Sequence, residues 1–417
     1  MFLATNTRLC NFPARFYIKI ANTVITPNWP RIAQKRDINY NPVIKSTSVT
    51  PTARRPDRKD MDIISALDRL GPKVSTEEVS DIVGIPARTV RYRIQRMRET
   101  GVLCPTRVMA LERRMGLGES IFVVNATSAG YQYLPNIFYK IDTIYHYSST
   151  YGRYNGFLAY SLYSLSTPRI VRRILEECQK YDLITDFFTV DVHDYDVKRA
   201  DYTRYDAESG WNWDWDDWES QITKNNRSKM KRKFKPPLNA DQTIVDFDFT
   251  DVSILKLMFD DGEITQKNLA EKLSLSETQV NKRIRQLEER GIIKGYRFAV
   301  SESDEFLPLF CFFELESPVS PVISNIYQLP FPATIMMESK TRYAMTMSLS
   351  AKDTKGFLKG FDILRPHLSS YFIQTVHDSQ RSMDSHPYDL FNLESNGWRT
   401  PGDEYIQDIH DVLAGKK

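Results

Sequence analysis

The sequence predicts an α+β protein made of two tandem repeats, each a helical head followed by a body of strands and helices. A shift of 190 residues superimposes 84–103, GIPARTVRYRIQRMRETGVL, on 274–293, SLSETQVNKRIRQLEERGII. Each segment contains the last of three consecutive helix-like stretches. Each set of three is followed by the order strand, helix, strand, strand, helix, strand, which predicts a ferredoxin-like βαββαβ domain with an antiparallel sheet.

The repeat extends beyond the heads. Chance could supply one short match, but four in the same order indicate that one unit is used twice. The three further matches are RY at 153–154 and 342–343, VHD at 192–194 and 376–378, and a tail, YDAESGW and YDLFNLESNGW, at 205–211 and 388–398.

Each head is predicted to contain a helix-turn-helix. In the second copy the apolar positions of Val252–Phe259 lie on one helical face, and Thr265–Leu273 begins with a threonine in N-cap position. A turn of three to four residues leads into Ser276–Arg290, where Ser276 and Gln279 form a capping box. This spacing of short helix, tight turn and longer helix is typical of a motif that reads double-stranded DNA.

The third helix of each head carries a polar, cationic face opposite its apolar positions. These side chains can donate to phosphates and to purine edges in the major groove. Arg93, Arg96 and Arg283 are expected to touch the DNA backbone or internal acidic residues. The predicted DNA-binding residues are Arg88, Thr89, Arg91, Tyr92, Gln95 and Arg96 in the first head, and Thr278, Gln279, Asn281, Lys282 and Arg285 in the second.

A cationic helix face can also be merely solvated, because charge runs are common on protein surfaces. The turn, the caps and the duplication favour DNA binding over that interpretation, although a helix-turn-helix sometimes serves only for protein contacts. The second copy carries Glu277, Glu288 and Glu289, so we expect it to attract DNA more weakly than the first.

Head and body together resemble the Lrp/AsnC family of prokaryotic transcription regulators. VRYRIQRMRETGVL (90–103), VNKRIRQLEERGIIKGYRFAV (280–300) and LERRMGL (111–117) carry this resemblance. It implies a winged head and a body that senses a small-molecule effector such as an amino acid. It also implies pairing through the sheets. Because two units are fused here, the expected pair is an intramolecular pseudo-dimer whose unlike heads read an asymmetric site, with further homo-oligomers left open.

The effector pocket that the resemblance implies maps onto the turn YGRYNG (151–156) and onto SKTRY (339–343). Two other functions stay open: siroheme decarboxylases resemble the same family, and a nucleoid-architectural protein would bind DNA with little sequence preference. For the enzyme, His146 would join the cleft, but the second unit has no matching histidine. The ligand-binding candidates are Tyr151, Arg153, Tyr154, Arg342 and Tyr343.

Two further features are predicted to be structural. In WNWDWDDWE (211–219) the carboxylates would repel phosphates, so Trp211, Trp213 and Trp215 are expected to pack against the sheet or the other unit. The His-Asp pairs at 193–194 and 377–378 occupy adjacent strand positions, which face opposite sides and cannot converge on one atom.

Composition limits the remaining classes. The net charge is only +3, and no apolar run approaches the roughly 20 residues that span a bilayer. The four cysteines form no C-x-x-C pair and fit a reducing cytoplasm, and six scattered histidines suggest no metal site. The usual phosphate-loop, serine-hydrolase and zinc-protease motifs do not occur, so we expect no enzyme activity and no cofactor.

Domain boundaries follow from these elements. The first segment is basic and lacks a sustained period, which is typical of a disordered arm. The predicted domains are a disordered basic arm (1–57), helix-turn-helix domain 1 (58–105), ferredoxin-like domain 1 with its Trp-rich tail (106–223), a basic linker (224–246), helix-turn-helix domain 2 (247–295) and ferredoxin-like domain 2 with a C-terminal tail (296–417).

Overall fold

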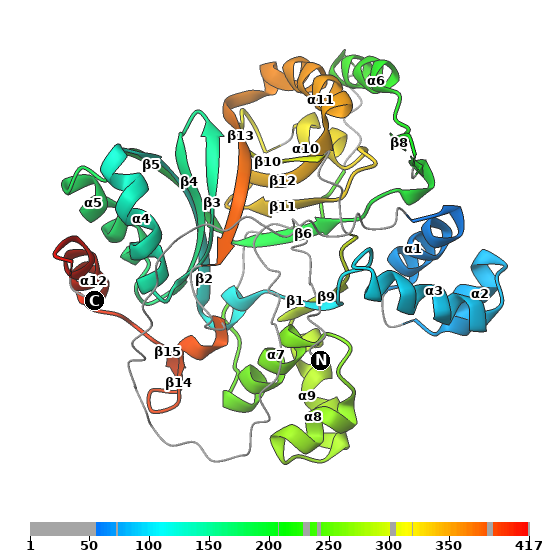
Figure 1. Ribbon diagram of the computed structural model, residues 1–417, viewed down its shortest axis with the longest axis horizontal. Helices are drawn as coiled ribbons and strands as arrows, with labels where there is room; N and C mark the ends of the chain where they lie inside the picture. The colour runs from blue at the N-terminus through cyan, green and yellow to red at the C-terminus, as the bar shows by residue number, and fades with distance from the viewer. Residues whose placement is uncertain are drawn as a thin grey trace, which may run out of the picture.

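The computed structural model contains two three-helix heads beside a central body of strands, with helices over its outer faces (Figure 1). This confirms the predicted α+β class with two tandem repeats. The basic arm predicted over 1–57 lies outside the described residues except for its last two. The structure describes residues 56–71, 74–206, 208–227, 234–239, 243–300, 306–318, 320–381 and 387–415.

Each head has three helices followed by a short strand. The middle helix is capped by Ser75 in the first head and by Thr265 in the second, because each side chain accepts a backbone N–H of the first turn. Head 1 comprises α1 (Arg58–Leu70), α2 (Thr76–Val83), α3 (Ala87–Glu99) and β1 (Arg107–Ala110), and head 2 comprises α7 (Phe249–Asp260), α8 (Gln266–Leu273), α9 (Glu277–Glu289) and β9 (Ile293–Arg297).

The strands that follow the two heads pair with each other. β1 and β9 are antiparallel, and Arg107 lies opposite Arg297. These two arginines are the residues that a 190-residue shift equates, so the pair marks a pseudo-twofold axis between the repeats. Sequence reasoning did not predict this strand pair, which joins the heads directly.

The bodies follow the predicted βαββαβ order. Body 1 comprises η1 (Glu112–Met115), β2 (Leu117–Ala126), α4 (Ser128–Lys140), β3 (Ile144–Gly152), β4 (Gly156–Ser164), α5 (Ile170–Lys180), β5 (Ile184–Val192) and β6 (Asp194–Lys198). Body 2 comprises β10 (Phe306–Leu315), α10 (Pro321–Ile326), β11 (Ala333–Met337), β12 (Arg342–Ser350), α11 (Ala351–Leu364), η3 (Arg365–His367) and β13 (Leu368–Arg381).

All nine body strands form one sheet in the order β5-β2-β4-β3-β13-β10-β12-β11-β6. The two end strands, β5 and β6, are consecutive in the chain and separated only by His193, whose N–H donates to the Met337 carbonyl at 2.8 Å. The sheet therefore closes on itself. β5–β6 begins in its own body and ends against β11, while β13 begins against β10 and ends against β3. The two bodies exchange strand ends reciprocally.

The closed sheet has an inner and an outer hydrophobic layer. Residues of both bodies meet inside it, among them Ile121, Tyr160, Phe312 and Phe372. Outside, α4 and α5 cover body 1, and α10 and α11 cover body 2. Strands β4 and β11 are buried along their whole length and are therefore largely apolar on both faces.

Each body sends its tail onto the other body. The tail of body 1 includes η2 (Tyr202–Arg204), the hairpin β7 (Tyr205–Asp206) and β8 (Gly210–Trp211), and α6 (Trp215–Arg227), which packs on α11. The tail of body 2 includes η4 (Pro387–Leu390), the hairpin β14 (Phe391–Asn392) and β15 (Gly397–Trp398), and α12 (Glu404–Leu413), which packs on α4 and α5. The linker predicted from residue 224 begins later, because α6 continues through Arg227.

The tryptophans of the first tail are structural, as predicted. Trp211 and Trp215 pack on Phe331 of body 2, with ring centroids 5.3 and 5.6 Å away. Trp213 lies 5.0 Å from the guanidinium of Arg204 and against the same core. Within the described residues, no helix is long and apolar enough to cross a membrane.

Candidate nucleic-acid interface

Helix α3 separates a buried face from an exposed one. Val90, Ile94 and Met97 are buried in the core of head 1, as their spacing predicts. Tyr92, on the opposite side, is 61% exposed. The predicted DNA-binding residues Arg88, Arg91, Tyr92, Gln95 and Arg96 are all exposed, and Thr89 is half-buried. The fold therefore places these six candidates on or beside one accessible face.

The exposed face of α3 is strongly cationic. The helix contains five arginines and a single glutamate. Arg91 also contacts Glu77 of α2 at 3.3 Å, but both side chains are 65% exposed, so the guanidinium stays accessible. Gln95 donates to Glu99 at 2.8 Å, which places that amide along the helix. This surface has the composition expected for contacts to phosphates.

Helix α9 of head 2 presents a different surface. It contains three basic and three acidic residues, so its charges balance. A groove of about 550 Å³ runs along it and is lined by Gln266 and the predicted residues Thr278, Asn281, Lys282 and Arg285. Gln279, the fifth candidate, completes the predicted capping box: its Oε1 accepts the Ser276 N–H at 2.8 Å.

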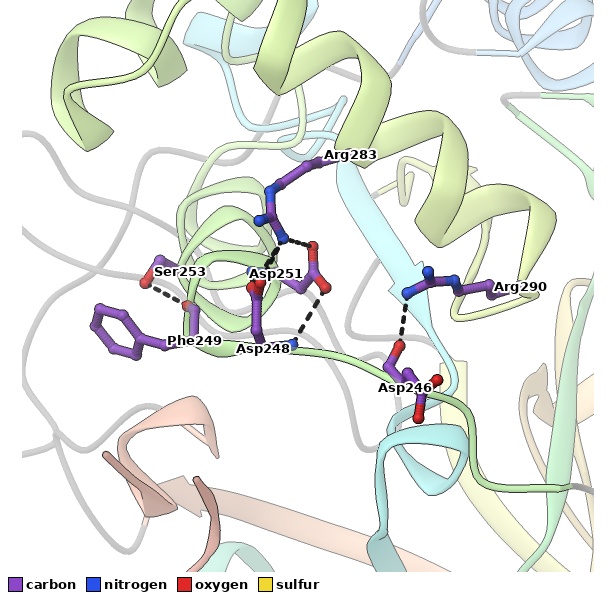
Figure 2. A network of polar contacts seen from close by, with 7 residues as sticks. All are labelled: Asp246, Asp248, Phe249, Asp251, Ser253, Arg283 and Arg290. Atoms are coloured by element: carbon purple, nitrogen blue, oxygen red, sulfur yellow. Dashed lines mark hydrogen bonds and ion pairs between the residues drawn. The ribbon is translucent and has the colours of Figure 1, made fainter. Parts of the chain in front are cut away.

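Both third helices are braced by an arginine that binds two aspartates of the first helix. The Arg283 guanidinium donates to Asp248 at 2.8 Å and to Asp251 at 2.9 Å, and Figure 2 shows the three side chains converging. Burial opposes ionisation of Asp248, but the Asp251 backbone N–H and Arg283 outweigh it and lower the Asp248 pKa. Arg290 donates to the Asp246 carbonyl at 2.6 Å, which anchors the segment that leads into α7.

Head 1 contains the same brace. Arg93 donates to Asp57 at 2.9 Å and to Asp60 at 2.6 Å, and the hydrogen bond to Asp57 raises the Arg93 pKa most. Arg93 and Arg283 thus contact internal acidic residues, one of the two expected roles. The aspartates were missed, although D-x-x-D recurs at 57–60 and 248–251, where the first aspartate caps the first helix and the second lies in its first turn.

The two heads also contact each other. Arg98 of α3 forms an ion pair of 2.5 Å with Glu263, in the loop after α7. The Arg107 guanidinium donates to the carbonyls of Phe259 and Asp260, both at 2.6 Å, at the end of α7. Gly262 donates its N–H to the Thr106 carbonyl at 3.1 Å. Head 2 is therefore held by the strand that leaves head 1.

The five ligand-binding candidates do not all lie at one site. Arg153 lies 5.8 Å from the rings of Tyr154 and Phe372, while Tyr151 is exposed. Tyr343 lies in a different core, under the helices of body 2, where it stacks 5.7 Å from Phe313. Burial raises the pKa of both Tyr154 and Tyr343.

Arg342 stacks on aromatic rings of both bodies, and these rings adjoin Phe372, the ring beside Arg153. Its guanidinium is 5.5 Å from Phe188 and 5.1 Å from Phe312, and it forms an ion pair with Glu338. Arg153 and Arg342 nevertheless correspond in the repeat, since each stacks on a phenylalanine of the other body. Their position supports a role in joining the bodies.

His146 and His377 also pack against aromatic rings. His146 is half-buried, 5.7 Å from the ring of Tyr160. His377 lies 5.6 Å from the ring of Tyr151. The buried Asp194 forms an ion pair with Lys294 and accepts the Asn239 N–H at 2.8 Å, which confirms a structural role for this residue. The described part of the chain contains no group of three or more side chains arranged to hold a metal ion.

Comparisons with known proteins agree with the geometry of the heads. The family of winged helix-turn-helix DNA-binding domains matches residues 56–103 and 248–294. Both heads are therefore winged helix-turn-helix domains. The leucine-responsive regulatory protein of Rhizobium meliloti is 42% identical over 59 residues, 14% of this chain and 38% of that protein. The transcriptional regulator LrpC of Bacillus subtilis is 36% identical over 67 residues, 16% of this chain and 46% of LrpC.

The chain spans less than half the length of these curated relatives. The solved structure of the siroheme decarboxylase NirDL is similar over 85% of this chain and 99% of that one, with 11% identity and a TM-score of 0.48. The two heads of this chain are therefore similar to those of Lrp-type transcription regulators.

Proposed function

We propose that this protein is a sequence-specific DNA-binding transcription regulator in which α3 reads the major groove. The cationic, exposed face of α3 carries this proposal. A helix of this kind positions arginines against phosphates and early-helix side chains against base edges. Arg88, Arg91 and Tyr92 combine donors with an aromatic ring on one turn of the helix.

The two heads are proposed to contribute unequally. The balanced charge of α9 gives it little long-range attraction to DNA, while its groove offers Thr278, Asn281 and Arg285 for short-range contacts. Because the β1–β9 strand pair connects the two heads, the chain would present two different surfaces to one duplex. The bound sequence should then be asymmetric.

The test is selection from a pool of random duplexes at two salt concentrations, followed by fluorescence anisotropy on the enriched sequence. Arg88→Ala combined with Arg91→Ala should weaken binding at least ten-fold and reduce the slope of log K against log salt by about 2. Arg172→Ala with Lys180→Ala is the matched control, since both side chains are 67% exposed on α5, in body 1. This pair should leave both quantities unchanged.

Each alternative result has a distinct meaning. Salt-sensitive binding without enrichment of any sequence would contradict specific regulation and favour an architectural role. Unchanged affinity in the Arg88/Arg91 double variant would exclude α3 as the reader. An absence of binding at low salt would refute the proposal as a whole. Sensing of an effector by the bodies stays a prediction, and titration of candidate amino acids into the DNA complex would test it.

A further inference from the structure

A cavity of about 550 Å³ lies where head 1 meets the β1–β9 pair. Leu70 and Val74, from the end of α1 and the turn after it, form part of its wall. Met109 of β1 and Tyr296 of β9 line it as well. One part of the lining is therefore apolar and is contributed by both repeats.

The rest of the lining is rich in cations. Arg199, Lys294 and Arg297 all contribute, with Glu78 as the acidic residue. Lys294 is ion-paired with Asp194, but Arg199 and Arg297 lie close enough to repel each other. Burial lowers the Arg297 pKa most, and the charge of Arg199 lowers it further. Nearby carboxylates act in the opposite direction and raise it.

Arg297 retains hydrogen-bonding capacity. Its Nε is buried and has no hydrogen-bond partner among the residues that the structure describes. A buried donor of this kind costs free energy unless an acceptor meets it. Two neighbouring guanidinium groups with a free donor form a suitable site for a carboxylate or phosphate, which accepts hydrogen bonds from planar guanidinium groups.

The arginine that is equivalent to Arg297 in the other repeat makes different contacts. Arg107, equivalent to Arg297, donates to two carbonyls at the end of α7 and so closes the junction with head 2. In head 1 the corresponding carbonyl, that of Arg69, accepts instead from Arg199 at 3.1 Å. Arg297 therefore faces the cavity. Among the described residues, the equivalent junction of head 2 has no such space, because a Cβ at Gly262 would lie 2.7 Å from the Thr106 carbonyl oxygen.

The hydrophobic cores of the two heads also differ, and head 1 is again the less tightly joined of the two. The core of head 2 is continuous with the inner core of the body. Head 1 has a separate core, with the side chains of Tyr202 and Tyr205 packed at its edge. The orientation of head 1 therefore depends on fewer apolar contacts, and a molecule that bridges head 1 to β9 would restrict it.

We propose that this cavity binds a small organic anion, in which a carboxylate or phosphate accepts from Arg297 and Arg199 and an apolar body packs on Leu70, Met109 and Tyr296. By bridging α1 and β9, the anion would fix the orientation of head 1. That consequence for DNA binding rests on the proposed function, whereas the binding itself does not.

The experiment is isothermal titration of the full chain, without DNA, using phenyl phosphate and inorganic phosphate as probes. Phenyl phosphate should bind at least five-fold more tightly than inorganic phosphate. Arg297→Gln and, independently, Arg199→Gln should each weaken phenyl phosphate at least ten-fold. Arg172→Gln, on the exposed side of α5, is the control and should bind as the unchanged protein does.

No binding of phenyl phosphate, or equal binding by the Arg297→Gln variant and the unchanged protein, would overturn the proposal. Displacement of phenyl phosphate by a short random duplex would assign the site to a DNA phosphate and would also overturn it. Arg297-dependent binding in a chain that fails to bind DNA would support this site and refute only the proposed function. Circular dichroism of each variant establishes that the heads are folded.

Discussion

Replacement of Gly360 by alanine tests whether the two repeats are locked together by the first tail. Gly356 and Gly360 lie one turn apart on α11, where α6 crosses it. Trp215 packs over the first glycine and Trp218 over the second. A Cβ at 360 would lie 1.9 Å from Cζ3 of Trp218, a ring that is only 1% exposed. The ring must move, and α6 must move with it.

The magnitude follows from three contributions. Forcing a carbon into a packed core costs about 1–3 kcal/mol. Complete expulsion of an indole that buries about 200 Å² would cost about 5 kcal/mol, which is the upper bound. Alanine is a better helix former than glycine and returns about 1 kcal/mol. Because the contact is ring against helix backbone, we take the upper end of the packing cost, about 3 kcal/mol, and after the helix-propensity gain expect Gly360→Ala to lower the free energy of unfolding by about 2 kcal/mol.

The assay is urea unfolding followed by far-ultraviolet circular dichroism and tryptophan fluorescence. Gly402→Ala is the control, since nothing lies within 4 Å of a Cβ there, and its effect should stay within about 0.5 kcal/mol. In a Trp218→Leu background the Gly360→Ala cost should disappear, because a smaller side chain leaves room. An equal cost in both backgrounds would refute the argument that ring and glycine pack directly.

Three other perturbations follow from contacts described above. Arg283→Met leaves Asp251, with 6% of its side chain exposed, without its guanidinium partner, and should destabilise head 2 by about 2 kcal/mol in hydrogen exchange. Burial lowers the Lys198 pKa to about 8, so the unfolded chain binds more protons above that pH. The unchanged protein should therefore gain roughly 2 kcal/mol over Lys198→Met between pH 8 and 10. Gly262→Ala, whose Cβ would meet the Thr106 carbonyl at 2.7 Å, should accelerate hydrogen exchange throughout α7.

Local patterns predicted the elements whose ends are determined locally. Helix α11 is of this kind, because Ser350 supplies its N-cap and its apolar positions follow one face. The predicted helix Thr265–Leu273 differs from α8 only in that Thr265 is the cap rather than the first helical residue. The order of strands and helices in each body was likewise predicted from the alternating and helical periods of its apolar residues.

Features that depend on distant partners were not predicted. β1 and β9 are short and polar in part, and each exists as a strand only because the other pairs with it. β6 was overlooked because its partner, β11, lies in the other body. The five ligand candidates were grouped by sequence identity, but Tyr343 and Arg342 are neighbours on a strand and point to different cores.

Fusion of the two units explains where the repeats have diverged. In a pair of identical chains both copies of a surface must serve the same role. Here the bodies keep reciprocal features: β5–β6 and β13 exchange strand ends, and α6 and α12 each cover the opposite body. The heads differ instead, since α3 is cationic where α9 is balanced, and Arg107 binds helix carbonyls where Arg297 faces a cavity. The bodies therefore supply a largely symmetric frame, and the charge differences that would distinguish two DNA half-sites lie in the heads and their junctions.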